Sequence, residues 1–181
     1  MTQKRTQKLA IAALFGALTF AATLIAFPFP PGYVNLGDGI LLVAAWLPME
    51  PWSIFAAAIG ASFADLALGY AIYAPATFVI KALMVTVVVL IKRGMPKTPA
   101  FWRALLSGIV AELVMVTGYF AYESILYGAK TALINVPFNL VQGGIAITVA
   151  TVLSLVLSNI PLPDVLRSQF TLLGKGFIKK K

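Results

Sequence analysis

The sequence predicts an all-α integral membrane protein, a bundle of six transmembrane helices forming a single domain over residues 1–181. Three observations lead there: an apolar composition, long apolar runs separated by prolines, and basic residues confined to one side. Hydrophobic residues make up 60% of the chain and charged residues 11%, against about 45–50% and ~25% in soluble domains. A soluble fold could not hide this excess, because even a ~150-residue domain buries only about 68–70% of its chain surface.

The apolar runs define the elements in order. A transmembrane helix needs roughly 20 mainly apolar residues. Ten of the eleven prolines fall at or outside the ends of runs, and Pro137 is placed in a first helical turn, where its missing N–H costs little. The second run, residues 40–47, would make only ~12–17 Å of helix, which fits a re-entrant piece, a buried core helix or a span starting near Asn35. The predicted spans are residues 9–27, 37–48, 52–70, 75–92, 103–127 and 135–160.

The basic residues set the number and direction of the spans. With six spans, twelve of the fourteen Lys and Arg lie on one side, Lys130 lies on the other and Lys81 lies inside the membrane. With five, the basic C-terminal tail would move opposite the basic N-terminus. The positive-inside rule therefore favours six spans with both termini in the cytoplasm. A cleaved signal peptide is the alternative at the N-terminus, but the first run is longer than the usual 7–15-residue core.

Several chemistries are absent from the sequence. The chain has no Cys and no His, which excludes thiol catalysis, Cys/His metal sites and imidazole acid–base chemistry. It has no Walker-type glycine loop, H-E-x-x-H or G-x-S-x-G motif, so we predict no cofactor and no enzymatic activity, an intramembrane Asp/Glu enzyme being the least favoured alternative. The net charge is +8, and the basic residues lie in short segments between apolar runs. This placement favours contact with anionic lipid over nucleic-acid binding.

Four ionisable residues interrupt the long apolar runs at residues 52–70, 76–91 and 105–126: Asp65, Lys81, Glu112 and Glu123. Such residues are rare in lipid and tend to face the protein interior or a cavity. Asp65 and Lys81 fall at similar depth on adjacent antiparallel helices. They form either a structural ion pair or a ligand-binding lysine held by Asp65, and a buried pair is weak evidence for either.

The fifth predicted helix carries a polar stripe. Glu112, Val116, Tyr119 and Glu123 are spaced to share one face. Two carboxylates and a phenol would suit a ligand that bears hydroxyl or amine groups. Glu123 has the alternative of reaching the outer membrane interface beside an aromatic belt.

Amides follow one another at the outer end of the sixth predicted helix. Asn135, Asn139 and Gln142 have i, i+4, i+7 spacing, and amides in lipid need partners. They serve either as interhelical hydrogen bonds or as ligand contacts. Their closeness in depth to Lys81 and Glu123 favours a shared pocket in the outward half of the bundle.

Small residues recur at every fourth position on two helices. The first helix has Ala13, Ala17 and Ala21, and the third has a similar row that includes Gly60. Such faces let helix backbones approach closely. They indicate either packing within this protein or a docking face for another membrane subunit.

Two stretches carry a family resemblance: YVNLGDG at residues 33–39 and SFADLALGYAIYAPATFVIK at residues 62–81. With the length, the six spans and the alanine-rich first helix, the chain resembles the substrate-binding S component of energy-coupling factor (ECF) vitamin transporters, in the riboflavin-type and hydroxymethylpyrimidine-type subgroup. The resemblance covers nearly the whole chain.

The resemblance implies a multi-pass protein of a prokaryotic plasma membrane that belongs to an ABC-type importer. An S component binds a vitamin from outside, associates with a membrane coupling subunit (EcfT-like) and two cytoplasmic ATPases (EcfA-like), and topples in the bilayer to release its cargo. The alanine row would meet the coupling subunit. The loop at residues 28–38 would close over the ligand, with Gly32, Gly37 and Gly39 supplying backbone freedom.

The resemblance also implies where the ligand lies and what it is. Expected ligands are hydroxymethylpyrimidine or a vitamin B6 compound, with riboflavin next, because carboxylates, amides and tyrosines suit a small aromatic heterocycle with hydroxymethyl groups. A membrane assembly subunit without a ligand is the alternative. The predicted substrate-binding residues are Asn35, Asp38, Lys81, Glu112, Tyr119, Glu123, Asn139 and Gln142.

Overall fold

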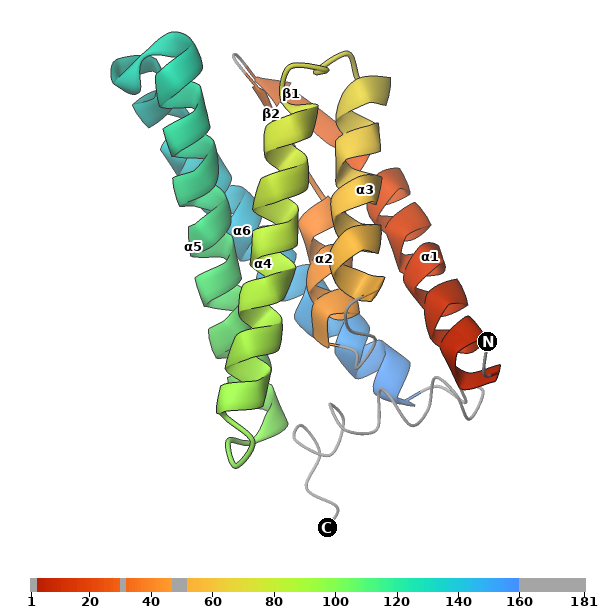
Figure 1. Cartoon of the computed structure of the whole chain (residues 1–181). Coiled ribbons are helices and arrows are strands. Elements are labelled where there is room, and N and C mark those ends of the chain that lie inside the picture. Colours follow the sequence, from red (N-terminus) through yellow and green to blue (C-terminus); the bar gives the residue numbers. More distant parts are fainter. Residues whose placement is uncertain (1–2, 30–31, 47–51, 160–181) are drawn as a thin grey trace.

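The computed structural model describes residues 3–29, 32–46 and 52–159 of the chain. Within these residues it contains six helices, in the predicted order, and one β-hairpin that the sequence analysis did not predict (Figure 1). The elements are α1 (Gln3–Thr23), β1 (Ala26–Phe29), β2 (Gly32–Asn35), α2 (Gly37–Trp46), α3 (Trp52–Ala67), α4 (Ala74–Gly94), α5 (Ala100–Tyr127) and α6 (Ala129–Asn159).

Four of the helices are long and apolar enough to cross a membrane: α1, α4, α5 and α6. The outward faces are apolar too, with Phe63 and Leu90 more than half exposed. Helices that are hydrophobic all round belong in lipid or in a core, so a multi-pass membrane bundle is confirmed. The apolar helices α2 and α3 are shorter, and the count of six crossings with both termini inside stays a prediction.

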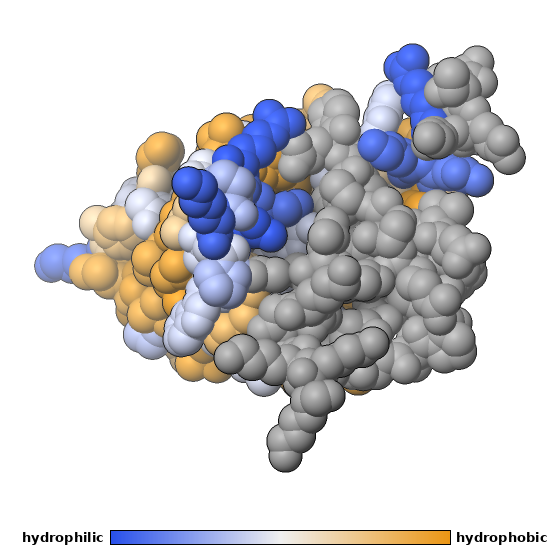
Figure 2. Space-filling model, turned by 90° about the horizontal axis from the view of Figure 1, so that it is seen from below, coloured by the Kyte–Doolittle hydropathy of each residue, from blue (hydrophilic) through white to orange (hydrophobic). Residues whose placement is uncertain are grey.

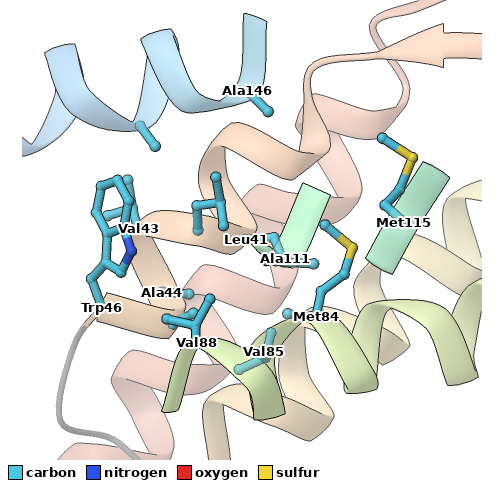
Figure 3. Close-up of a cluster of buried hydrophobic side chains, with 14 of the residues drawn as sticks. Leu41, Val43, Ala44, Trp46, Met84, Val85, Val88, Ala111, Met115 and Ala146 are labelled. Carbon is cyan, nitrogen blue, oxygen red and sulfur yellow. The ribbon is translucent and has the colours of Figure 1, made fainter. Parts of the chain in front are cut away.

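Helix α2 lies in the centre of the bundle. Nine of its ten residues are buried, and it packs against α1, α3, α4 and α6. Figure 3 shows Leu41 of α2 together with Met84 of α4, Met115 of α5 and Ala146 of α6. Of the three alternatives for this run, the structure therefore supports a buried core helix. Ten residues rise only ~15 Å, less than the ~30 Å hydrocarbon core of a bilayer.

The segment predicted as a loop is partly a β-hairpin, so the purely α-helical prediction is wrong here. Strands β1 and β2 pair antiparallel with Pro28 opposite Tyr33. Proline fixes φ and biases the preceding residue towards extended backbone, and a two-stranded hairpin has only edge strands, which tolerate proline. The same extended segment ends α1 at Thr23, before the predicted end at residue 27.

The glycines after the hairpin serve close packing. A Cβ at Gly37 would lie 2.0 Å from Oγ1 of Thr23, and one at Gly39 would lie 2.7 Å from Cγ1 of Val149. Both glycines belong to the first turn of α2 rather than to a loop. Oδ1 of Asn35 accepts a hydrogen bond of 2.8 Å from the Gly37 N–H and so caps the start of α2.

Helix α6 begins earlier than predicted. Its first residue is Ala129, so Pro137 lies in the helix interior and not in the first turn. An interior proline removes one backbone hydrogen bond, and transmembrane helices tolerate this because neighbouring groups satisfy the freed carbonyl. The amide row therefore lies deeper in the helix than the sequence predicted.

Small residues bring α1 and α3 together. A Cβ at Gly60 would lie 2.2 Å from the carbonyl oxygen of Gly16. The backbones of α1 and α3 are therefore in direct contact here, which small residues allow. The row on α3 thus packs inside the protein. Ala13, Ala17 and Ala21 of α1 are exposed, and Ala13 borders the groove between α1 and α3.

The two ends of the bundle differ in charge. Figure 2 views the end that carries the N-terminus and shows hydrophilic side chains gathered on it. At this end lie exposed Arg5 and Lys8 of α1, Arg93 in the last turn of α4, and Lys97 in the α4–α5 connection (Figure 1). The β-hairpin lies at the opposite end.

Candidate functional site

A polar cavity lies at the hairpin end of the bundle. The cavity volume itself is about 30 Å³, and the surrounding non-atom space, which includes the open mouth, is about 420 Å³. The hairpin, α3, the α3–α4 connection, α4, α5 and α6 all contribute to its wall. The lining residues are Gly32, Tyr33, Asn35, Asp65, Tyr70, Tyr73, Thr77, Tyr119, Glu123, Asn135, Asn139 and Gln142.

The cavity collects five of the eight predicted binding residues: Asn35, Tyr119, Glu123, Asn139 and Gln142. The amide row of α6 therefore faces the polar stripe of α5, as the matching depths predicted. Ligand contact by these residues stays a prediction. The other three predicted residues are not part of the lining, although Asp38 and Lys81 contact lining residues.

Lys81 pairs with Asp38 and not with Asp65. Nζ of Lys81 lies 2.6 Å from Oδ1 of Asp38, and both residues are at most 2% exposed. Nε2 of Gln142 donates to the second Asp38 oxygen at 2.6 Å, and the lysine lies 5.3 Å from the Tyr119 ring centroid. The expected pairing of Lys81 with Asp65, which rested on their similar depth in the membrane, is wrong. The first turn of α2 brings the carboxylate of Asp38 nearer to the lysine.

The hairpin joins the same network. The backbone N–H of Asn35 donates to Oε1 of Gln142 at 2.9 Å. We call Asn35, Asp38, Lys81 and Gln142 the polar clasp, since they connect β2, α2, α4 and α6. Every carboxylate oxygen in the clasp has a partner, as a stable buried ion pair requires.

Asp65 instead holds the hairpin from α3. The Tyr33 hydroxyl donates a hydrogen bond to Oδ1 of Asp65, and its ring lies 4.9 Å from that of Tyr70. Burial raises the pKa of Tyr33, and the nearby Asp65 carboxylate raises it further. The phenol therefore keeps its proton and remains the donor in this contact.

Glu123 has a similar tyrosine partner. The Tyr73 hydroxyl donates to Oε1 of Glu123 at 3.3 Å, and burial raises the pKa of Tyr73. The second oxygens of Asp65 and Glu123, and Oδ1 of Asn135, are buried and have no hydrogen-bond partner among the described residues. The cavity thus offers unused acceptors, which a ligand with donor groups would satisfy.

Tyrosines form one wall of the cavity, and the sequence analysis missed three of the four. The rings of Tyr33, Tyr70, Tyr73 and Tyr119 contact one another in series, with centroid distances of 4.9, 6.2 and 6.4 Å. We call them the tyrosine wall. Tyr70 and Tyr73 follow Asp65 closely in the stretch at residues 62–81. Their closeness in sequence to this buried carboxylate was the feature that could have indicated them as lining residues. Aromatic walls are typical of sites for ring-shaped ligands.

Glu112 lies outside the cavity. It is two helical turns, ~10 Å, from Tyr119 along α5. A Cβ at Gly143 would lie 3.0 Å from the Glu112 Cβ, so Glu112 of α5 packs closely against α6. The groove between these helices that Glu112 lines is otherwise apolar. Neither of its oxygens has a hydrogen-bond partner among the described residues. The structure therefore does not place Glu112 with the other predicted binding residues.

Comparison with known proteins identifies the family. The family described as ECF-type riboflavin transporter, S component, matches residues 3–159, which include every described helix and the hairpin. A Pyrococcus woesei protein described as "Uncharacterized protein in gap 3'region" is 32% identical over 128 residues, covering 70% of this chain and 84% of that protein. The chain therefore belongs to the S components of ECF-type riboflavin transporters, a family of membrane substrate-binding transporter subunits.

Proposed function

We propose that this S component captures a B-vitamin or vitamin precursor outside a prokaryotic cell. It then delivers the cargo by toppling with a membrane coupling subunit (EcfT-like) driven by two cytoplasmic ATPases (EcfA-like). The observation that carries the proposal is the tyrosine-walled polar cavity beneath the hairpin. Basic residues gather at the other end of the bundle, so the positive-inside rule supports a cavity on the outer side.

The proposed ligand is hydroxymethylpyrimidine or a pyridoxine-like compound. Both are small aromatic rings with hydroxymethyl groups. The rings would stack on the tyrosine wall, while hydroxyl and amino groups would donate to the free oxygens of Asp65, Glu123 and Asn135. Riboflavin is the second candidate, and the description of the matched family favours it.

A binding panel tests this function. Purified protein in detergent, without ATP, is titrated with the B-vitamins and their precursors by calorimetry. We expect at least one hydroxylated heterocycle to bind with micromolar or lower Kd. Tyr70→Ala should weaken that binding by about tenfold, the upper range for one aromatic contact. Phe63→Ala, an aromatic deletion on the outer face of α3, should leave the Kd unchanged. If no compound in the panel binds at micromolar concentration, the proposal fails, and an assembly subunit without ligand becomes the better reading.

The exposed alanine row predicts the coupling-subunit contact. Ala17→Trp puts a large side chain on a face that needs close helix approach, so co-purification of the coupling subunit with this protein should be lost while ligand affinity stays unchanged. Leu90→Trp, on the exposed face of α4, is the control and should keep the complex. Loss of ligand binding in Ala17→Trp would instead place this face in the packing of the protein itself.

A further inference from the structure

The cavity end of the bundle has more buried carboxylates than cations. Asp38, Asp65 and Glu123 are each at most 3% exposed, and Lys81 is the buried cation among the described residues there. The lysine contacts Asp38 at 2.6 Å. Lys81 also attracts the Asp65 carboxylate from farther away, and Asp38 repels that carboxylate less strongly. The cavity lining itself contains two carboxylates and no Lys or Arg.

Each of the two lining carboxylates is only half satisfied. Asp65 accepts a hydrogen bond from Tyr33 and has the Thr77 hydroxyl close by. Glu123 accepts one from Tyr73 and has the Asn135 amide close by. The remaining oxygen of each is shut off from solvent and has no partner among the described residues. A carboxylate taken out of water without a counter-charge is destabilised by several kcal/mol, so occupancy by a neutral ligand would leave most of this cost in place.

The tyrosine wall also favours a positively charged occupant. The four rings lie side by side with the carboxylates, joined through the Tyr33–Asp65 and Tyr73–Glu123 hydrogen bonds. Aromatic faces carry partial negative charge and attract cations, by ~0.5–1 kcal/mol at exposed sites and by 2 or more when desolvated. Lys81 already lies over Tyr119 in this way.

We infer that the cavity selects a positively charged heteroaromatic ligand, one with a protonated or quaternary ring nitrogen. This inference rests on the proposed function and narrows its substrate class. The ring stacks on the tyrosine wall, and its positive charge is shared between Asp65 and Glu123. Phosphorylated and carboxylated vitamins are rejected, because each would place its negative charge beside the two acidic side chains of the cavity.

The test uses three matched probes at pH 8, where the parent ring is uncharged: 4-amino-5-hydroxymethyl-2-methylpyrimidine, its N1-methylated cation and its 5-carboxylic acid. Calorimetry on the purified protein should give a Kd at least about tenfold lower for the cation than for the neutral parent, given desolvated cation–π and charge attraction. The anion should not bind. Glu123→Gln should reduce the cation preference to about threefold or less, because one counter-charge is gone. Glu112→Gln removes a buried carboxylate outside the cavity and should leave the preference intact.

A second readout does not depend on the ligand. Because unpaired buried carboxylates destabilise the empty protein, Asp65→Asn and Glu123→Gln should each raise its Tm by about 2 °C or more. Equal or weaker binding of the cation, or a lower Tm in both variants, would overturn the inference. If none of the three probes binds, the proposed heterocycle function is contradicted, and the Tm of the two variants alone decides whether the cavity holds uncompensated negative charge.

Discussion

Lys81→Met should be the most destabilising single substitution in the polar clasp. It removes the ammonium that lies 2.6 Å from Asp38 and leaves a carboxylate in the centre of the bundle with Gln142 as its remaining partner. Breaking a buried pair by removing one partner costs about 3–5 kcal/mol. The Tm, followed by tryptophan fluorescence because the chain has three Trp and no Cys for thiol dyes, should fall by about 6 °C or more.

The double variant Lys81→Met/Asp38→Asn is the matched control for this prediction. It removes both charges while keeping a side chain of similar shape beside Gln142, so it should recover most of the lost stability. A Lys81→Met protein with an unchanged Tm and lost ligand binding would contradict a structural pair. It would return Lys81 to the role of a ligand-binding residue that the sequence analysis left open.

Gly60→Val should have the second largest effect, through the contact of α3 with α1. Even a Cβ at this position would lie 2.2 Å from the carbonyl oxygen of Gly16, which is backbone and cannot rotate away. The two helices would have to separate, and we expect a loss of about 3 kcal/mol, the upper range for overpacking. Thermal unfolding of the purified protein measures this loss.

A second glycine separates this clash from general helix propensity. A Cβ at Gly144, also in a helix interior, would meet nothing within 4 Å. Gly144→Ala should therefore leave the Tm unchanged or raise it, since alanine favours a helix by about 0.5–1 kcal/mol over glycine. If Gly60→Val unfolded at the same temperature as the unmodified protein, the close approach of α1 and α3 would be wrong.

Local periodicity predicted most of the helices and half of the site. Apolar runs and prolines determine where α3, α4 and α5 lie in the sequence. The i, i+4 spacing on one helix determines which side chains share a face, so Tyr119 and Glu123 of α5 and Asn139 and Gln142 of α6 were found without tertiary information. Because these four residues also match in depth, the packing of two antiparallel helices was enough to bring them together.

The remaining part of the site depends on how distant segments meet. Asp38 and Lys81 are 43 positions apart, and their pairing follows from the insertion of α2 into the bundle centre, which no local pattern reveals. Tyr33 reaches Asp65 only because β1 and β2 pair, and a proline-rich segment indicates extended backbone without indicating a partner strand. Glu112 shares a face with Tyr119, but it packs against Gly143 of α6 in a separate groove outside the cavity.

The short connection between the hairpin and α2 limits how the cavity can exchange its contents. Only Leu36 separates β2 from α2, and the Asn35 side chain is hydrogen-bonded across that junction to the Gly37 N–H. Gly37 is in turn held against Thr23 of α1. The hairpin is therefore not a freely hinged flap: its outward movement strains the same helix that fills the core. We therefore expect ligand entry to the proposed site to require loosening of the bundle, so that a more rigid bundle would hold its ligand for longer.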